Sequence, residues 1–236
     1  MTDIASHPGP RAFIVGWPVA QSRSPLIHGH WLRLHGLSGS YERIAVPPEE
    51  IEAFLRALPD SGLVGGNVTV PHKEVAFRIA SEKDAVALAT GAVNTLWIEA
   101  GKLCATNTDA VGFLANLDDR AVGWDARPGV AVVLGAGGGA RAVVWGLLQR
   151  GFAVRVVNRT LARAEELAAR FGPRVSAHGF DALPRLLADA TLLANTTSLG
   201  MAGKGDLDLD LTPLPADALV TDIVYVPLVT PLLAAA

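Results

Sequence analysis

A continuous apolar segment that leads directly into a glycine-rich turn constrains the fold of this chain more than any other feature. Residues 130–134 are all aliphatic, as in parallel strands that are buried on both faces. The turn after them fits the pattern G-x-G-x-x-G/A and precedes an expected helix that reaches about Arg150. Its residues are Gly135, Ala136, Gly137, Gly138, Gly139 and Ala140. In this context the amides at the helix N-terminus bind a pyrophosphate, although the glycines could instead serve only close packing of strand and helix.

Short apolar segments alternate with amphipathic ones along the whole chain, a pattern typical of α/β proteins. In the second half we expect strands over residues 153–157, 190–194 and 219–223 and a helix over residues 161–170. The first half is expected to hold strands at residues 12–16, 41–46 and 63–70, a hairpin of residues 95–98 and 103–106, and helices from Ser24 to near Gly36, over 48–58 and over 71–80. Ser24, before Pro25, is expected to cap the first of these helices.

The length of 236 residues suits two domains, and the boundary is placed at a predicted helix that starts at Asp109. Residues 1–108 then form one α/β domain and residues 109–225 a Rossmann-like domain with a parallel sheet. Residues 226–236 follow as a short C-terminal segment.

Composition excludes several classes of protein. Half of the residues are hydrophobic and 18% are charged, as in a globular domain, and the net charge of −3 includes no basic block of the kind that binds nucleic acid. The single cysteine, Cys104, excludes an intrachain disulfide and favours a reducing compartment. Residues 1–11 do not read as a signal peptide, and no apolar run is long enough to predict a membrane span. We therefore expect a soluble, cytoplasmic protein whose partner is a small molecule.

No metal site is expected. His28 and His30 would lie on different faces of the predicted helix. His28 and His35 could share a face, but no acidic residue or cysteine nearby would complete a ligand set.

The residues after the strand at 153–157 favour NADP over NAD. NAD-binding sites usually place an acidic residue there for the ribose 2′-hydroxyl, whereas this chain has Asn158, Arg159 and Thr160, followed by Arg163. If Thr160 caps the next helix, Arg163 lies in its first turn, where a cation is unfavourable unless an anion lies beside it. The 2′-phosphate of NADP would be that anion; alternatively, both arginines only solvate a surface.

Polar clusters in the first half of the chain fall near the ends of predicted strands. Ligands of open α/β sheets bind beyond the carboxyl ends of the strands, so these clusters are expected to converge on one site. Ser22 and Ser24 would hold a carboxylate, and Asn67 and Asn94 would pair with hydroxyl groups. The alternatives are that Ser24 is only a helix cap and that the asparagines are only turn residues.

Lys73 and Asp109 are the candidates for proton transfer. Lys73 follows Pro71 in a predicted first helical turn, where the positive end of the helix dipole makes an ammonium proton easier to give up. Asp109 beside it would oppose that effect, because it favours the charged ammonium. The alternatives are a solvated lysine and a carboxylate that only stabilises the first turn of its helix.

Taken together, these motifs resemble the shikimate dehydrogenase family in the same order over nearly the whole chain. They are GWPVAQSRSPLIH at residues 16–28, GNVTVPHK at 66–73, GAVNT at 91–95, NTDAVG at 107–112, the glycine turn at 135–142, NRT at 158–160 with Arg163, NTTSLGM at 195–201 and DIVYVPLVTP at 222–231. The resemblance implies an N-terminal substrate-binding and catalytic domain and a C-terminal NADP-binding domain.

The resemblance also implies an activity: the reversible reduction of 3-dehydroshikimate to shikimate with NADPH, a step of aromatic amino-acid synthesis. Lys73 and Asp109 are then catalytic. The substrate-binding residues are Ser22, Ser24, Asn67, Thr69, Asn94 and Tyr225. The cofactor-binding residues are the glycine turn, Asn158, Arg159, Thr160, Arg163, Thr196, Ser198 and Met201.

Two alternatives stay open: a quinate/shikimate dehydrogenase that prefers NAD and a catalytically silent NADP-binding protein. A third, a nucleic-acid-binding module, has no basic stripe to support it. Family members usually continue beyond the Thr-Pro-Leu segment into a stretch with a substrate-binding glutamine and closing helices that return to the first domain, and residues 226–236 would be the start of that return segment. These parts have no counterpart before Ala236, and we expect their absence to weaken substrate binding more than NADP binding. A monomer or a homodimer is expected.

Overall fold

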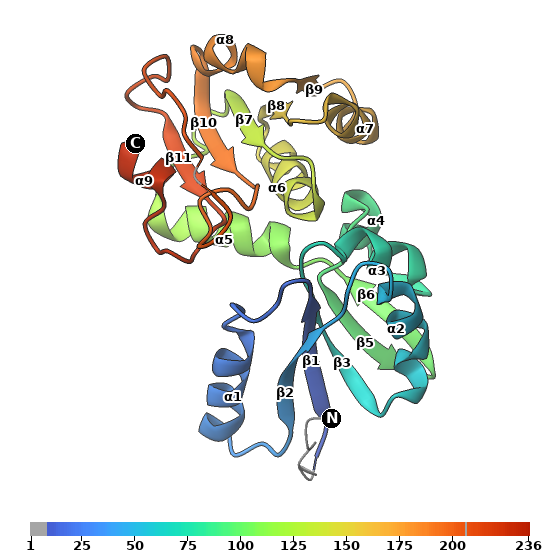
Figure 1. Ribbon diagram of the computed structural model, residues 1–236. Coiled ribbons are helices and arrows are strands. Elements are labelled where there is room, and N and C mark those ends of the chain that lie inside the picture. Colours follow the sequence, from blue (N-terminus) through green and yellow to red (C-terminus); the bar gives the residue numbers. More distant parts are fainter. Residues whose placement is uncertain (1–8, 206) are drawn as a thin grey trace. The chain divides into compact units, whose positions relative to one another are not determined.

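The computed structural model describes residues 9–205 and 207–236, which divide into two compact α/β units between Thr108 and Asp109 (Figure 1). Each unit has its own sheet and its own hydrophobic core. Both units fit the α/β fold class that the alternation of segments predicts.

The first unit is built on a mixed six-stranded sheet in the order β2-β1-β3-β5-β6-β4. Its strands are β1 (Arg11–Gly16), β2 (Ser40–Ala45), β3 (Leu63–Val68), β4 (Glu82–Lys83), β5 (Thr95–Glu99) and β6 (Lys102–Thr106). Its helices are α1 (Ser24–Leu34), α2 (Ile51–Ala57), the short 3-10 helix η1 (Leu58–Asp60), α3 (Lys73–Ile79) and α4 (Ala85–Thr90). Strand β1 pairs in parallel with β2 and β3, whereas the hairpin β5–β6 adds antiparallel pairing at β3. The predicted hairpin is confirmed, and its turn residues Ala100 and Gly101 both have positive φ, as a two-residue hairpin turn requires.

The core of this unit lies on the face of the sheet that α2, α3 and α4 cover. Phe13 and Val15 alternate with Ile14 along β1, so they point to the same face and pack with buried residues of these helices, among them Leu55 and Ala76. Figure 1 shows α2 and α3 next to each other, away from α1, which contributes no residue to this core. Helix α1 contacts β1 and β2 instead, and none of its residues is buried.

Three local expectations for this unit need correction. Ser24 does not cap α1: the helix begins at Ser24 itself, and the serine hydroxyl contacts Ser22 instead of the helix amides. The expected helices 48–58 and 71–80 are shorter, because Pro48 and Pro71 lie in turns before them. Helix α4 was not predicted, although Asp84 caps it by accepting a hydrogen bond from the amide of Ala87 at 2.8 Å.

The second unit is a parallel five-stranded sheet in the order β11-β10-β7-β8-β9. Its strands are β7 (Val130–Leu134), β8 (Ala153–Val157), β9 (Val175–His178), β10 (Ala190–Asn195) and β11 (Leu219–Asp222). Its helices are α5 (Asp109–Arg120), α6 (Gly138–Gln149), α7 (Leu161–Phe171), the 3-10 helix η2 (Phe180–Ala182), α8 (Leu183–Leu187) and α9 (Pro231–Ala235). The order reverses between β7 and β10, as in dinucleotide-binding folds. Strand β9 and helices α8 and α9 were not predicted.

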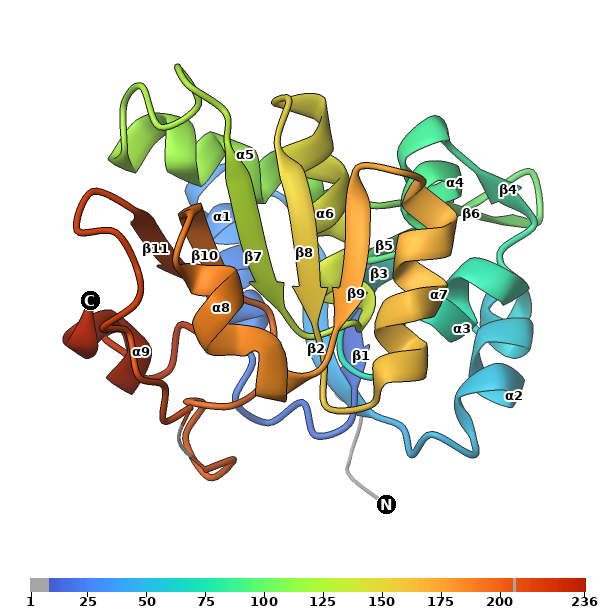
Figure 2. The ribbon, with the colours of Figure 1, turned by 90° about the horizontal axis from the view of Figure 1, so that it is seen from above.

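Strand β7 is buried on both faces. Ala131 and Val133 pack with buried residues of α5, α6 and α7, whereas Val132 and Leu134 pack in a second cluster that includes residues of α8 and α9. Figure 2 shows α8 on one side of the sheet and α6 on the other. The continuous apolar sequence of β7 therefore reflects two cores that meet at one strand. Within the described part of the chain, no helix is long and apolar enough to span a membrane.

We expect Leu147→Ala to lower the free energy of unfolding by about 2–5 kcal/mol, because the substitution leaves a cavity under α6. Leu147 is fully buried in the core that α6 shares with β7. The matched control is Val122→Ala, since Val122 is 89% exposed, and its effect should stay within about 0.5 kcal/mol. Urea denaturation followed by circular dichroism measures both. Equal losses in the two variants would contradict the assignment of this core.

Candidate functional site

The glycine turn connects β7 to α6 and leaves the N-terminus of the helix open. Gly135 has φ +104°, a conformation that side chains with a Cβ rarely adopt, and a Cβ there would lie 2.8 Å from Thr196 Oγ1. Gly137 is the N-cap residue, with extended backbone and no side-chain cap. Apart from Gly137 itself, its chain neighbours and the adjoining helix backbone, no atom of the described residues lies within 4 Å of the position that a Cβ on Gly137 would take. The amides of Gly138, Gly139 and Ala140 therefore begin a helix whose N-terminus suits an anion.

The end of β10 lies beside this turn, at the point where the strand order reverses. The amide and the hydroxyl of Thr196 both donate to the carbonyl of Leu134, at 2.9 and 2.6 Å. This pair of bonds fixes the start of the 196–201 loop against the end of β7. Ligands of doubly wound sheets bind at such a switch point, so Thr196, Ser198 and Met201 lie in a loop that starts where a dinucleotide is expected.

A buried polar network that the sequence analysis missed holds this loop and the segment after β11. Asn195 is fully buried; its amide nitrogen donates to Asp222 Oδ1 at 3.0 Å and to the carbonyl of Leu199 at 3.2 Å. Its oxygen accepts from the amide and the hydroxyl of Thr197. Asp222 in turn accepts from the hydroxyl of Thr230, whose side chain caps α9. The only sign of this network in the sequence was that Asn195 and Asp222 are the first residues of the motifs at 195–201 and 222–231.

Tyr225 follows this network in the second unit and is 47% exposed. The network fixes the backbone that leads to it, because Asp222 Oδ1 accepts from the amide of Val224 at 2.9 Å. Asp109 also belongs to the second unit, as the first residue of α5. The predicted start of a helix at Asp109 is confirmed, whereas its pairing with Lys73 stays a prediction.

The residues expected to select NADP lie at the end of β8 and in the first turn of α7. The side-chain amide of Asn158 donates to the carbonyl of Thr160 at 2.8 Å. Thr160 is the N-cap residue of α7, as expected, but its side chain makes no capping hydrogen bond. Arg159 and Arg163 are both exposed, and the first turn of α7 holds no acidic residue. Two cations at the positive end of a helix therefore create a site that favours an anion.

In the first unit, Ser22, in the loop after β1, lies beside Ser24, the first residue of α1. The hydroxyl of Ser22 donates to that of Ser24 at 3.2 Å, and the amide of Ser24 donates to Ser22 Oγ at 3.3 Å. Ser22 is buried, and its carbonyl accepts two hydrogen bonds from the guanidinium of Arg43 in β2, at 3.0 and 2.5 Å. Arg43 thus fixes the backbone of the segment that carries both hydroxyls. This role of Arg43 could not be inferred from the sequence.

Asn67 and Asn94 are joined through the sheet. Asn67 lies near the end of β3, and its amide nitrogen donates to the carbonyl of Asn94 and to Thr95 Oγ1, both at 3.2 Å. Its oxygen accepts from the hydroxyl of Tyr41 in β2. Asn94 is buried, and its side chain binds both the hydroxyl and the amide of Thr108, each at 2.9 Å. The alternative that Asn67 is a turn residue is therefore wrong, because it belongs to a strand.

Lys73 lies in the first turn of α3, as predicted, although the helix begins at Lys73 and not at Pro71, and its backbone carbonyl accepts from the amide of Val93 at 3.0 Å. This bond brings the start of α3 next to the segment that carries Asn94. His72, directly before Lys73, is buried, and its Nε2 is 2.8 Å from the carbonyl of Val46. Burial lowers the pKa of His72, so the imidazole is neutral and Nε2 can donate to that carbonyl. Thr69 continues from β3, where its amide donates to the carbonyl of Val15 at 2.9 Å.

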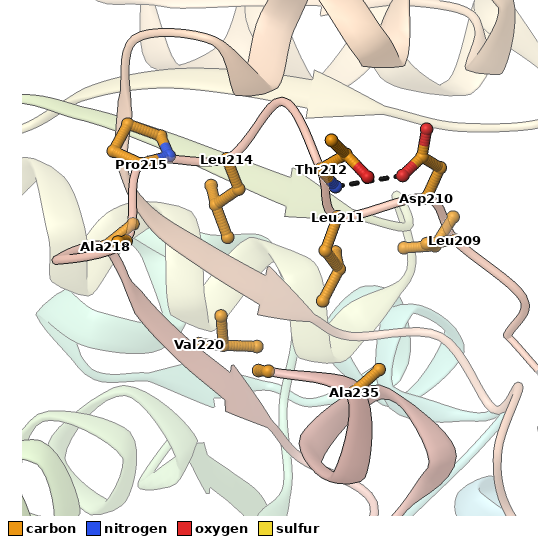
Figure 3. A pocket seen from close by; sticks show the side chains of 11 residues that line it. Leu209, Asp210, Leu211, Thr212, Leu214, Pro215, Ala218, Val220 and Ala235 are labelled. Atoms are coloured by element: carbon orange, nitrogen blue, oxygen red, sulfur yellow. Dashed lines mark hydrogen bonds between the residues drawn. The ribbon is translucent and has the colours of Figure 1, made fainter.

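A separate hollow of about 470 Å³ lies at the edge of the second sheet (Figure 3). Most of the residues around it are apolar in type, among them Leu209, Leu211, Val220 and Ala235, but the surface that they expose to the hollow is mainly polar. The polar contact drawn there is the bond from the Thr212 amide to Asp210 Oδ1 at 2.9 Å. None of the residues that line it is a candidate site residue. This hollow is therefore not part of the candidate site.

Two family models match the chain, one for each unit. The shikimate dehydrogenase substrate binding domain matches residues 14–96, and the shikimate / quinate 5-dehydrogenase family matches residues 122–201. The two models follow each other along the chain in the same order as the motifs found in the sequence.

Curated relatives and solved structures agree with these models. A shikimate dehydrogenase (NADP(+)) of Azorhizobium caulinodans is 60% identical over 96% of this chain and 81% of the relative. The structure of shikimate 5-dehydrogenase from Thermus thermophilus in complex with NADP(H) and shikimate has a TM-score of 0.82 and 36% identity, covering 95% of this chain and 82% of that one. Quinate dehydrogenase from Corynebacterium glutamicum in complex with NAD has a TM-score of 0.82 and 27% identity, covering 96% and 84%. Identity at this level across both units confirms the resemblance: the chain belongs to the shikimate dehydrogenase family.

Proposed function

We propose that this chain is an NADP-dependent shikimate dehydrogenase, which catalyses the reversible reduction of 3-dehydroshikimate to shikimate in aromatic amino-acid synthesis. The observation that carries this proposal is the 60% identity over 96% of the chain to a relative named shikimate dehydrogenase (NADP(+)). Residues 1–108 would bind substrate and carry the catalytic groups, and residues 109–225 would bind NADP. We expect the protein to work in the cytoplasm as a monomer or homodimer.

The second unit would hold the cofactor at the carboxyl ends of its strands. When bound, NADPH supplies the hydride that reduces the C3 carbonyl of the substrate. The amides after Gly137 would bind the pyrophosphate, and the open space at Gly137 supports this assignment. Arg159 and Arg163, with Asn158 and Thr160, would bind the 2′-phosphate through charge-assisted hydrogen bonds. The loop that contains Thr196, Ser198 and Met201 would line the cofactor from the β10 side.

The first unit would hold the substrate. Ser22 and Ser24 present two neighbouring hydroxyls that would donate to the carboxylate, and Tyr225 would add a third donor. Asn67, Thr69 and Asn94 would orient the ring hydroxyls. The hydrogen bonds that already hold Asn67 and Asn94 support this role, since a rigid site loses less conformational entropy when it binds.

Lys73 would supply the proton. As hydride reaches the carbonyl carbon, negative charge develops on the oxygen, and an ammonium placed there neutralises it by proton transfer. Asp109 would hold the lysine side chain and favour its charged form before the reaction. In the reverse direction the same lysine would accept the proton from the alcohol.

The alternative closest in chemistry is a quinate/shikimate dehydrogenase that prefers NAD. The uncharged Asn158 and the two exposed arginines weigh against it. We expect this chain to reduce NADP in the presence of shikimate with a kcat/KM at least about tenfold above that with NAD or with quinate, as measured by absorbance at the nicotinamide band. A preference for NAD would favour the quinate/shikimate alternative, and no turnover with either cofactor would favour a catalytically silent NADP-binding protein.

Replacing both Arg159 and Arg163 with alanine should weaken NADP binding by about a hundredfold or more and leave NAD binding within about threefold. The physical reason is that hydrogen bonds to a charged group contribute about 1.5–3 kcal/mol each. Arg127→Ala is the matched control, because this exposed arginine lies before the amino end of β7. Titration calorimetry with each cofactor measures the effect. Parallel losses for NADP and NAD would show that the arginines do not recognise the 2′-phosphate.

Lys73→Ala should lower kcat by on the order of a hundredfold or more, the range expected when a general acid is lost. Its dissociation constant for NADP should stay unchanged, because Lys73 belongs to the other unit. Lys102→Ala serves as the control, since Lys102 is exposed and pairs with Glu82 in the same unit. Steady-state kinetics and NADP titration test both variants. Turnover of the Lys73 variant near that of the unaltered protein would remove this residue from the mechanism.

A further inference from the structure

Tyr41 lies in β2, outside every motif that identified the candidate site, yet it contacts two residues of that site. Its hydroxyl donates to Asn67 Oδ1, from a position 26 residues away in the sequence. The Ser24 side chain lies close enough to the Tyr41 hydroxyl to lower its pKa, against the larger effect of burial, which raises it. The Tyr41 hydroxyl therefore lies between Ser24, at the start of α1, and the end of β3.

The contacts of Asn67 determine what its side chain can offer to a ligand. Both hydrogens of its amide nitrogen are directed to protein oxygens, the carbonyl of Asn94 and the hydroxyl of Thr95. Its oxygen has two lone pairs, and Tyr41 occupies one of them. These bonds leave the Asn67 side chain with one remaining hydrogen-bonding position, the second lone pair of Oδ1, which can accept a hydrogen bond. In this orientation Asn67 suits a hydroxyl that donates to it, such as a hydroxyl of the substrate ring.

The Tyr41 side chain is itself held in place. The His28 ring stacks on the Tyr41 ring, with centroids 4.0 Å apart and an angle of 5° between the planes. Burial raises the pKa of Tyr41 above its ordinary value, so the phenol remains protonated and remains a donor. Burial also lowers the pKa of His28, which favours a neutral ring against the phenol. Tyr41 can therefore hold the Asn67 amide in one orientation throughout the neutral pH range.

We propose that Tyr41 is a positioning residue for substrate binding, which acts by fixing the Asn67 amide so that its oxygen faces a hydroxyl of the substrate ring. This inference rests on the proposed function, because it assigns the ligand of Asn67 as shikimate. Without the phenol hydroxyl, the Asn67 oxygen loses its internal donor, and only the two bonds of the amide nitrogen still hold the side chain, so its alignment with the substrate is weakened. The expected consequence is weaker binding of shikimate and little change in cofactor binding.

The test is Tyr41→Phe, which removes the hydroxyl and keeps the ring that stacks on His28. We expect the KM for shikimate to rise about tenfold, the KM for NADP to stay within about twofold and kcat to fall less than about threefold. Ser40→Ala is the matched control: it also removes a hydroxyl from β2, one that bonds Glu42 and no site residue, and it should leave all three parameters unchanged.

A double-mutant cycle with Asn67→Ala separates positioning from a general structural effect. If Tyr41 acts through Asn67, adding Tyr41→Phe to Asn67→Ala should change the KM for shikimate by no more than about twofold. A full tenfold rise on the Asn67→Ala background, or an unchanged KM in Tyr41→Phe alone, would overturn the inference while leaving the proposed function intact. If the unaltered protein neither binds nor turns over shikimate, as judged by calorimetry and absorbance, both the proposed function and this inference are wrong.

Discussion

The burial of β7 on both faces is the constraint on which the nucleotide-binding half of the structure depends. Because its side chains alternate between two cores, β7 must lie inside the sheet, with helices packed over both of its faces. The chain leaves β7 towards β8 and β9 on one side, and the connection after β9 then crosses to β10 on the other side of β7. This reversal brings the ends of β7 and β10 together, where Thr196 binds the carbonyl of Leu134. The close approach requires a residue without a Cβ at Gly135, so the glycine turn follows from the packing of the strand before it.

In the first unit, polar side chains at the ends of strands are shielded from solvent, so their hydrogen bonds are made within the protein. Asn94 is buried, and its oxygen and nitrogen are both hydrogen-bonded within the protein, as burial of an amide requires. Asn67 and Tyr41 extend the same network across β3 and β2. Side chains held by several such bonds have few orientations available, so the groups that would meet the substrate are ordered before it arrives.

The helices and strands of the second unit were predicted more accurately from the sequence than those of the first unit. In the second unit, the strands β7, β8, β10 and β11 and the helices α6 and α7 were predicted within a residue or two, because a buried parallel strand gives a strong local signal. Strand β9 was missed: Val175–His178 holds only one buried residue, and polar residues alternate along it. In the first unit, β4 consists of two residues, Glu82 and Lys83, which become a strand only by pairing with β6.

For the candidate site residues as well, local signals in the sequence could be found and long-range contacts could not. Motifs located Ser22, Asn67, Lys73 and Asp109, because the residue types and their positions after predicted strands carry the signal. The partners that hold them, Tyr41 and Arg43, lie in a strand whose sequence gives no sign of a special role. An apolar alternation predicts where a strand is but not which neighbours it will have, so the hydrogen bonds across β2, β1 and β3 could not be derived from it.

The sequence by itself determined the α/β class, the position of the glycine turn and the residue types at the positions proposed for catalysis and for binding a 2′-phosphate. These features depend on contacts within about 20 residues, where hydrophobic period, glycine conformation and helix start signals act. Only the tertiary structure decided that Tyr41 pairs with Asn67 and that Asn195 pairs with Asp222, because the residues of these pairs are 26 and 27 positions apart. Such pairs depend on strand order and register, which arise when whole elements pack against one another and which no local stretch of sequence encodes.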